Sequence, residues 1–368
     1  MRVPLLDLNA QYEPIMKQVR QNIDQVLSTH QYILGPEVKQ FEEMMEEFLN
    51  VNHAIGCASG TDALVLALRA LNIGTGDEVI TTPFTFFATA GTIHRVGAKP
   101  IFVDVKEDTY NIDPDLIEKA ITNKTKAIMP VHLFGQPCEM DRIVQIAKKH
   151  NLYVIEDNAQ GIGAVYDGQN AGTIGEIGTL SFFPSKNLGC MGDGGMCVTQ
   201  DEELAKRLRQ LRVHGENPKY FHKWVGFNSR LDTIQAAVLS AKLPHLAKWS
   251  EMRRENADYY YANMKDIKQI KMPVIHDKAV SIFNQFTLFA KDRDGLMKHL
   301  KKANIGCAIY YPLPLHLQEC FGELCGKKGD CPVSERAAEN VVSIPIYSEL
   351  TKDQQDYVID TIRGFYNK

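Results

Sequence analysis

Short apolar runs alternate with helical patterns along most of this chain. Amphipathic helices are predicted at residues 114–121 and 140–150, and the spacing of apolar residues predicts two earlier ones within 15–26 and 38–48. The strand-like runs are residues 79–81, 101–105, 127–131, 153–155, 179–183 and 196–198. This alternation predicts an α/β fold in which helices flank a mostly parallel central sheet.

The length of the chain favours two domains. Its 368 residues, of which 44% are hydrophobic, can bury a sizeable core. A helical stretch over residues 231–261 predicts the passage from one domain to the next. We therefore expect a large domain over 1–245, including an N-terminal helical segment, and a smaller α+β domain over 246–368.

Charge and hydropathy exclude several classes of partner. The net charge is −4, and no basic arm or Lys/Arg run is present, which argues against nucleic-acid binding. No segment approaches ~18 uninterrupted apolar residues, and the N-terminus lacks the apolar stretch of a secretory signal. These features predict a soluble, cytoplasmic protein without a membrane partner.

The eight cysteines do not form a recognisable metal or disulfide pattern. Five are scattered singly among apolar or small residues and are typical of reduced packing cysteines. Cys320, Cys325 and Cys331 lie closer together, but their spacing differs from that of zinc knuckles. We expect no metal site, and we predict an exposed loop over residues 322–330.

One lysine lies between a strand-like run and a glycine-rich turn. Lys186 follows the run at 179–183 and precedes glycines at 189, 192, 194 and 195. A desolvated lysine amine is a nucleophile for carbonyl chemistry, including that of pyridoxal 5′-phosphate (PLP). Because an isolated lysine is more often an exposed surface residue, the neighbouring motifs decide between the two interpretations.

A second motif places an acid at the end of a strand. Asp157 ends the apolar run 152–157, and Gln160 follows three residues later. Ligands of open α/β sheets bind at the carboxyl ends of strands. An aspartate there can pair with the pyridine nitrogen of PLP and make the ring an electron sink, or it can simply cap a helix.

Two further motifs fit the remaining parts of such a cofactor. Gly60 and Thr61 belong to a small polar turn that opens an apolar helix, and a helix N-terminus can bind a phosphate. An ordinary capped helix is the alternative interpretation. Phe84, Phe86 and Phe87 follow the strand-like run at 79–81, and one of their rings could stack on a flat ligand, although phenylalanine is more often a core residue.

In the order phosphate turn, aromatic, acid and lysine, these motifs resemble the DegT/DnrJ/StrS family of PLP-dependent sugar aminotransferases. Members of that family have the type I fold of aspartate aminotransferase. The likeness covers nearly the whole chain, from residues 4–8 and 32–38 to residues 310–316. It implies a PLP enzyme that transaminates a nucleotide-linked ketosugar.

The resemblance also implies roles for individual residues. Lys186 would form the Schiff base with PLP and shuttle the proton, and Asp157 would pair with the pyridinium nitrogen. Phe86 would stack on the ring, where many relatives carry Trp or Tyr. The remaining cofactor contacts implied are Gln160 to the ring hydroxyl and Gly60, Thr61, Ser181 and Asn228 to the phosphate, with Asn228 supplied by the neighbouring subunit of a homodimer that shares its active sites.

Substrate residues are less strongly indicated. Arg230 could meet a diphosphate, or it could form a surface ion pair. Tyr310, Tyr311 and His316 could face the sugar, or they could pack at the domain interface. The amino donor is expected to be L-glutamate.

A non-catalytic PLP-fold regulatory protein is the main alternative of a different class. A chain that only binds has no need of Lys186, Asp157 and a phosphate turn together, so the enzyme is favoured. The lysine also argues against a PLP-dependent sugar dehydratase, whose relatives carry histidine there. A nicotinamide enzyme is not indicated, because no G-x-G-x-x-G follows a strand.

The residues around Lys186 indicate the position of amination. Asn187, Leu188 and Gly189, followed by the glycines near 194, resemble the 3-aminotransferase branch, whereas 4-aminotransferases more often carry Thr-Thr-Gly-Glu-Gly. Within that branch, the segment is most similar to enzymes that act on UDP-linked 3-keto-hexuronic acids in surface-polysaccharide (lipopolysaccharide) synthesis. A dTDP-linked 3-keto-6-deoxyhexose is the first alternative, and a 4-ketosugar is the second.

Overall fold

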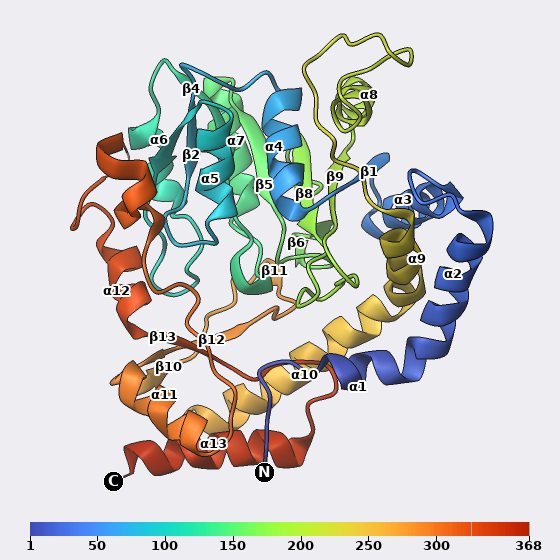
Figure 1. Ribbon diagram of the computed structural model, residues 1–368. Coiled ribbons are helices and arrows are strands. Elements are labelled where there is room, and N and C mark those ends of the chain that lie inside the picture. The colour runs from blue at the N-terminus through green and yellow to red at the C-terminus, as the bar shows by residue number, and fades with distance from the viewer. Residues whose placement is uncertain (325, 368) are drawn as a thin grey trace.

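A seven-stranded sheet forms the centre of the computed structural model, which describes residues 1–324 and 326–367 (Figure 1). Strands β2, β3, β4, β5 and β8 are parallel, and β9 runs antiparallel between β8 and β1. In spatial order the strands are β1 (His53–Cys57), β9 (Gly195–Thr199), β8 (Ile177–Ser181), β5 (Tyr153–Asp157), β4 (Thr125–Met129), β2 (Glu78–Thr81) and β3 (Lys99–Phe102). The predicted mostly parallel sheet is confirmed.

Helices cover both faces of this sheet, because neighbouring residues of each strand point to opposite faces. On one face, Val79 and Ile155 pack under α4 (Gly60–Ala70), α5 (Ala88–Arg95) and α8 (Glu202–Leu211). On the other face, Ile80 and Val154 contact α6 (Pro114–Ala120) and α7 (Met140–His150). Helices α3 (Pro36–Leu49) and α9 (Thr233–Lys242) complete that second face beside β1, β8 and β9.

The predicted strands differ from the structure at two places. The run at 101–105 leaves the sheet after Phe102, and Val105 forms an isolated bridge with Ile112 instead. Strand β1 was not predicted, since its sequence His-Ala-Ile-Gly-Cys contains no run of β-branched or aromatic residues. Tertiary pairing with β9 makes it a strand.

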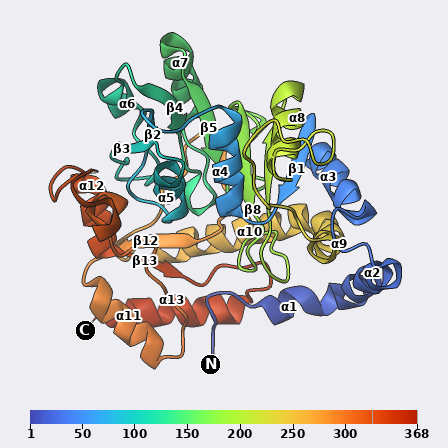
Figure 2. The same ribbon diagram turned by 45° about the horizontal axis from the view of Figure 1, so that its top comes forward.

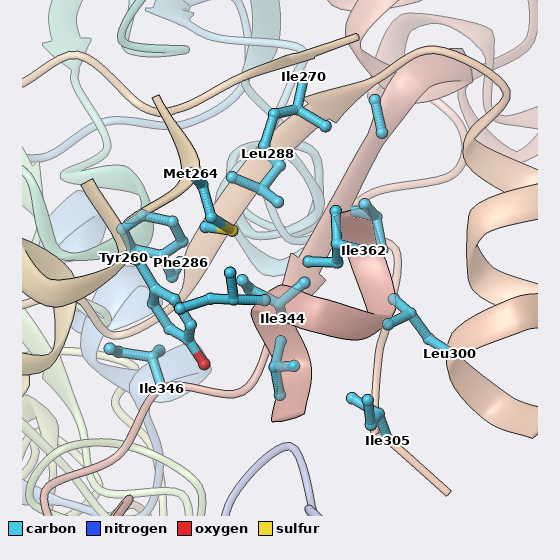
Figure 3. Close-up of a cluster of buried hydrophobic side chains, with 14 of the residues drawn as sticks. Tyr260, Met264, Ile270, Phe286, Leu288, Leu300, Ile305, Ile344, Ile346 and Ile362 are labelled. Carbon is cyan, nitrogen blue, oxygen red and sulfur yellow. The ribbon is translucent and has the colours of Figure 1, made fainter. Parts of the chain in front are cut away.

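The C-terminal part of the chain has its own core, shown in Figure 3, where Tyr260, Phe286, Ile344 and Ile362 converge. Its antiparallel sheet has the order β10 (Ile270–Lys271), β12 (Phe286–Ala290) and β13 (Val341–Ile344). The surrounding helices are α10 (Leu246–Met264), α11 (Arg293–Lys302), α12 (Pro332–Asn340) and α13 (Lys352–Tyr366).

The N-terminal residues join that second core. Val3 is fully buried there, and its N–H donates to the carbonyl of Asn304 (3.0 Å). A 3-10 turn, Leu243–His245, separates α9 from α10. The domain boundary near residue 245 stays a prediction, and the packing of Val3 means that the first residues associate with the C-terminal part.

The remaining helices and strands lie outside the two main sheets. Helices α1 (Leu8–Tyr12) and α2 (Met16–Thr29) lie beside α9 and α10 in both views (Figures 1 and 2). A small sheet joins β11 (Ala279–Val280), β6 (Val165–Tyr166) and β7 (Gln169–Asn170). Among the described residues, no helix is long and apolar enough to cross a membrane.

The predicted exposed loop over 322–330 is confirmed at residues 326–330, which are exposed and lie outside helices and strands, whereas Gly322 is exposed but belongs to a 3-10 helix, Glu319–Leu324. Cys325, one of the three clustered cysteines, lies outside the described residues. Of the other two, Cys320 is exposed and Cys331 is buried. The described part of the chain holds no group of three or more His, Cys, Asp or Glu side chains arranged for a metal ion.

Candidate active site

The sequence motifs meet at one edge of the large sheet. Asp157 and Ser181 end β5 and β8, and Gly60 starts the helix that follows β1. These three strands point in the same direction, since β9 is antiparallel to both β1 and β8. Their carboxyl ends therefore meet at one edge, where ligands of such sheets bind.

Lys186 projects from a loop that the sheet closes at its base. The N–H of Phe182 donates to the carbonyl of Gly194 (2.8 Å), so residues 183–194 form a loop between β8 and β9 whose two ends are joined by a hydrogen bond. Within it, the N–H of Lys186 donates to the carbonyl of Phe183 (2.8 Å). Burial lowers the pKa of the Lys186 amine to about 8, against the opposing effect of the Asp157 carboxylate. About a tenth of an amine with this pKa is uncharged at pH 7, far more than of an exposed lysine, and the uncharged form is the nucleophile.

Asp157 is buried, with 4% of its surface exposed. Its carboxylate accepts hydrogen bonds from the Thr89 hydroxyl (2.8 Å) and the Ala159 N–H (3.2 Å). Burial raises the pKa of Asp157, although both hydrogen bonds act in the opposite direction. A cationic ring nitrogen beside this carboxyl would stabilise its charged form, so the site fits a pyridinium partner.

The turn before α4 is tight and offers donors to an anion. A Cβ atom on Gly60 would lie 2.6 Å from the Cβ of Ser181, so only glycine allows this approach. The Ser59 hydroxyl accepts from the N–H of Asp62 (3.1 Å) and begins the helix. The first N–H groups of any helix lack intrahelical acceptors, and here they lie beside the hydroxyls of Thr61 and Ser181. This donor set suits a phosphate.

Gln160 is held by two partners. Its Oε1 accepts from the N–H of Phe134 (2.7 Å), and its Nε2 donates to the hydroxyl of Tyr311 (3.0 Å). The ring of Tyr311 lies 6.2 Å from that of Phe86, centroid to centroid. Phe86 is 57% exposed, so its ring can still cover a flat ligand. The structure thus brings Tyr311 to the candidate cofactor residues Gln160 and Phe86, whereas the sequence suggested a contact with the sugar or packing at the domain interface.

Asn228 and Arg230 lie in a different part of the site. They line a hollow of about 690 Å³ together with Ser59, Gly192 and Asp193. Asn228 is exposed, and Arg230 is half-buried without an ion-pair partner among the described residues. Within one chain, therefore, these two side chains border the phosphate turn but are open to another molecule.

The structure separates the three C-terminal candidates for sugar binding. Tyr310 is half-buried, contacts the ring of Tyr311 (5.8 Å) and lines a small cavity beside Ser185. The structure contradicts a sugar contact for His316. Only 2% of this residue is exposed, its Nε2 contacts Glu335 (3.1 Å), and its ring packs on Phe102. A side chain enclosed in this way has no face left for a sugar.

Sequence reasoning missed several supporting residues. Thr89 holds Asp157 from a helix 68 positions away. On the neighbouring position of β5, Glu156 is fully buried, contacts His132 (2.8 Å) and accepts from the N–H groups of Ile174 and Gly175. The adjacent acids Glu156 and Asp157 could have indicated this second site. Neighbouring strand residues point to opposite faces of the sheet, so a buried acid on the other face needs partners of its own.

Comparison with known proteins identifies the family. The profile of the DegT/DnrJ/EryC1/StrS aminotransferase family matches residues 14–363. The chain belongs to this family. The resemblance read from the motifs is confirmed, and the protein is a PLP-dependent sugar aminotransferase whose buried acid, amine and phosphate turn fit that cofactor.

Three curated relatives are similar over almost their whole length. A pleiotropic regulatory protein of Geobacillus stearothermophilus is 49% identical over 100% of this chain and 99% of its own. A UDP-N-acetyl-3-dehydro-α-D-glucosamine 3-aminotransferase of Acidithiobacillus ferrooxidans is 45% identical over 98% and 97%. A dTDP-3-amino-3,4,6-trideoxy-α-D-glucose transaminase of Streptomyces venezuelae is 42% identical over 98% and 96%.

A solved structure confirms the fold. The crystal structure of S. venezuelae DesV in complex with a ketimine intermediate has a TM-score of 0.98 to this chain, at 41% sequence identity. The alignment covers 100% of this chain and 99% of that one. The type I fold expected from the motifs is therefore present from end to end.

Proposed function

We propose that this protein transfers an amino group from L-glutamate to C3 of a nucleotide-linked 3-ketosugar, with a UDP-linked 3-keto-hexuronic acid as the leading substrate. The observation that carries the proposal is the pairing of a partly neutral amine, on Lys186, with a buried acid, on Asp157, at one edge of the sheet. Transamination needs both a proton carrier and an acid that holds a ring nitrogen.

The residues divide this work among them. PLP supplies the electron sink for the electrons of a cleaved C–H bond. The Asp157 carboxylate would keep the pyridine nitrogen protonated, and the Lys186 amine would take and return the proton at the carbon that carries nitrogen. Gly60, Thr61 and Ser181 would hold the phosphate, while Phe86 and Gln160 would fix the ring. Because these residues would hold the reacting groups in fixed positions, the proton transfers would proceed as nearly unimolecular steps.

The position of amination is supported by the named relatives. The 45% and 42% identical transferases both carry position 3 in their names, one with a UDP sugar and one with a dTDP sugar. The residues after Lys186 favour the same branch, and UDP-linked uronates within it. Arg230 is available for the diphosphate, because no acid occupies it within the described chain. The product would then enter surface-polysaccharide synthesis.

We also propose a homodimer with shared sites, in which Asn228 reaches the phosphate of the neighbouring subunit. Asn228 is exposed in the single chain, and several apolar side chains nearby in sequence or in the site are exposed as well. Phe183 is 52% exposed and Val225 87%. A second copy related by two-fold symmetry would cover such surfaces on both chains at once.

One panel of substrates tests the reaction. The purified enzyme is incubated with L-glutamate and with 3-keto or 4-keto sugars carrying UDP or dTDP, and the products are identified by mass and NMR. We expect a 3-amino sugar, formed fastest from the UDP-linked uronate. A 4-amino product alone would overturn the regiochemistry. Absence of turnover with every ketosugar would favour the regulatory role suggested by the name of the 49% identical relative.

A further inference from the structure

Lys242, the last residue of α9, is buried without a carboxylate partner. None of its surface is exposed, and the ion pairs of the described residues do not include it. Its Nζ instead donates to three neutral oxygens: the carbonyl of Gly189 (2.6 Å), Oε1 of Gln11 (3.1 Å) and the hydroxyl of Tyr12 (3.2 Å). The three N–H bonds of an ammonium group match this set.

Burying a charge in this way is costly, and apolar side chains of similar size are often neutral or stabilising replacements. The ring of Tyr12, 4.3 Å from Nζ, offsets part of that cost through a cation–π contact. Stability therefore gives little reason for a lysine at this position. The contacts of the ammonium group give a better reason for this lysine.

The oxygen closest to Lys242 belongs to the loop that carries Lys186. Gly189 follows Lys186 by three positions and sits in a tight bend, since a Cβ atom there would lie 2.4 Å from the carbonyl of Pro184. A hydrogen bond to the Gly189 carbonyl fixes this bend in place. The position of the bend sets the direction in which the preceding residues leave it.

Helix α9 holds the same loop at a second point. Gln235 lies two turns before Lys242, on the same face of the helix. Its Oε1 accepts from the N–H of Met191 (2.8 Å), and its Nε2 donates to the carbonyl of Met191 (3.2 Å). One helix face thus holds both Gly189 and Met191.

The other side of Lys186 is anchored by the C-terminal part of the chain. Asn187 donates to the carbonyl of Ile282 (3.2 Å) and accepts from the Nδ2 of Asn284 (2.7 Å). The loop is therefore held between two elements, and Lys242 also links it to α1 through Gln11 and Tyr12. Without Lys242, Gln235 would remain as the polar contact from α9 among the described residues, beside the apolar cluster that Leu188 and Cys190 share with this helix.

We propose that Lys242 is a positioning residue for Lys186: its buried ammonium joins α1, α9 and the Gly189 carbonyl, and so holds the Lys186 amine toward Asp157. The inference rests on the role proposed above for Lys186. Lys242 itself touches neither cofactor nor substrate. It acts on the reaction only through the backbone of the loop.

The test compares Lys242→Met with Lys248→Met, an exposed lysine on the next helix. Apoproteins are mixed with PLP and borohydride, and peptide mass spectrometry follows the rate of labelling at Lys186. Hydrogen exchange of residues 183–194 is measured on the same apoproteins. We expect labelling about tenfold slower and faster exchange in this loop for Lys242→Met, because the Gly189 carbonyl loses its charged donor and keeps only the longer hydrogen bond from the Tyr12 hydroxyl (3.4 Å). Lys248→Met should match the wild type.

In turnover, Lys242→Met should lower kcat more than it changes KM. A variant that is merely less stable would lose labelling only in proportion to its unfolded fraction, and that result, or labelling at the wild-type rate, overturns the proposal. Should Lys242→Met fail to fold, Gln235→Leu, at a half-buried position, must show the same loop-specific exchange. If wild-type Lys186 is not labelled at all, the role proposed for Lys186 fails instead.

Discussion

The two ends of the active site are built in different ways. At the cofactor end, Asp157 is almost wholly buried, holds two hydrogen bonds and lies at the end of a central strand. At the other end, Asn228, proposed to reach the phosphate of the neighbouring subunit, and Arg230, proposed to meet the substrate diphosphate, lie in an open hollow on a loop near Val225, which is 87% exposed. The sheet and its helices thus fix the first end within one chain.

This difference separates chemistry from specificity. Residues on strand ends have positions set by the whole sheet, so a single substitution there alters the reaction itself. Residues on open loops can change with little cost to the fold, and loops often carry recognition for that reason. The two transferases named above fit this division, since their names share an amino group at position 3 but differ in nucleotide and sugar.

The largest effect is expected at the cofactor end. Lys186→Ala should reduce turnover by at least about a thousandfold, because it removes the group that carries the proton. Single-turnover assays with L-glutamate measure this loss. If borohydride labelled a different lysine in the wild type, or if this variant kept normal rates, the cofactor end would be wrongly assigned.

Asp157→Ala should weaken PLP binding next most strongly. Loss of one partner from a buried charge pair costs roughly 3 to 5 kcal/mol. Equilibrium dialysis of PLP against wild type, Asp157→Ala and Asp157→Asn gives the affinities, with circular dichroism as the control for folding. Near-normal affinity and turnover in Asp157→Ala would remove this residue from the proposed pair.

The open hollow predicts activity that depends on two chains, because Asn228 is proposed to reach the phosphate of the neighbouring subunit. Lys186→Ala and Asn228→Ala are each expected to be impaired, but a mixed dimer should regain one site that has both residues intact. Co-expression with two different affinity tags isolates the mixed dimer for assay. Sharing of sites is ruled out if the mixed dimer is no more active than its parents, or if the wild type is an active monomer.

Arg230→Ala tests the open end of the site, and we expect a smaller effect from it. We expect KM for the nucleotide sugar to rise by about tenfold or more, as for the loss of a hydrogen bond to a charged group, while PLP affinity stays unchanged. Steady-state kinetics gives KM for the nucleotide sugar, and dialysis of PLP against the same preparation gives the PLP affinity. Weaker PLP binding with an unchanged KM would place Arg230 at the cofactor end instead.

The smallest effect is a shift in pH dependence. The pKa of Lys186 lies at about 8, so its reductive methylation in the apoprotein should rise with pH and reach half its maximum near that value. The Asp157 carboxylate raises this pKa, so Asp157→Asn should move the midpoint to lower pH. Mass spectrometry of the Lys186 peptide across pH 6 to 10 measures both. A midpoint near that of exposed lysines would contradict burial as the cause.

The fold class could be predicted, and candidate cofactor residues could be named, because their signals are local. Helix periodicity, strand-like runs and short motifs around Gly60, Asp157 and Lys186 depend on residues within a few positions of one another. They indicated the sheet, the family and the order of the cofactor residues. The same local reasoning missed β1 and extended the run at 101–105 too far, since strand pairing with distant segments decides both.

Long-range contacts are what only the tertiary structure decided. Thr89 reaches Asp157 across 68 positions, and Lys242 reaches Gly189 across 53. The sequence offered both Tyr311 and His316 as candidate sugar contacts, yet packing enclosed His316 and brought Tyr311 to Gln160. The sequence alone determined which chemical groups the chain carries and the order in which they occur. Which of them meet depends on how distant helices and strands bury their apolar faces together, and no local pattern records that.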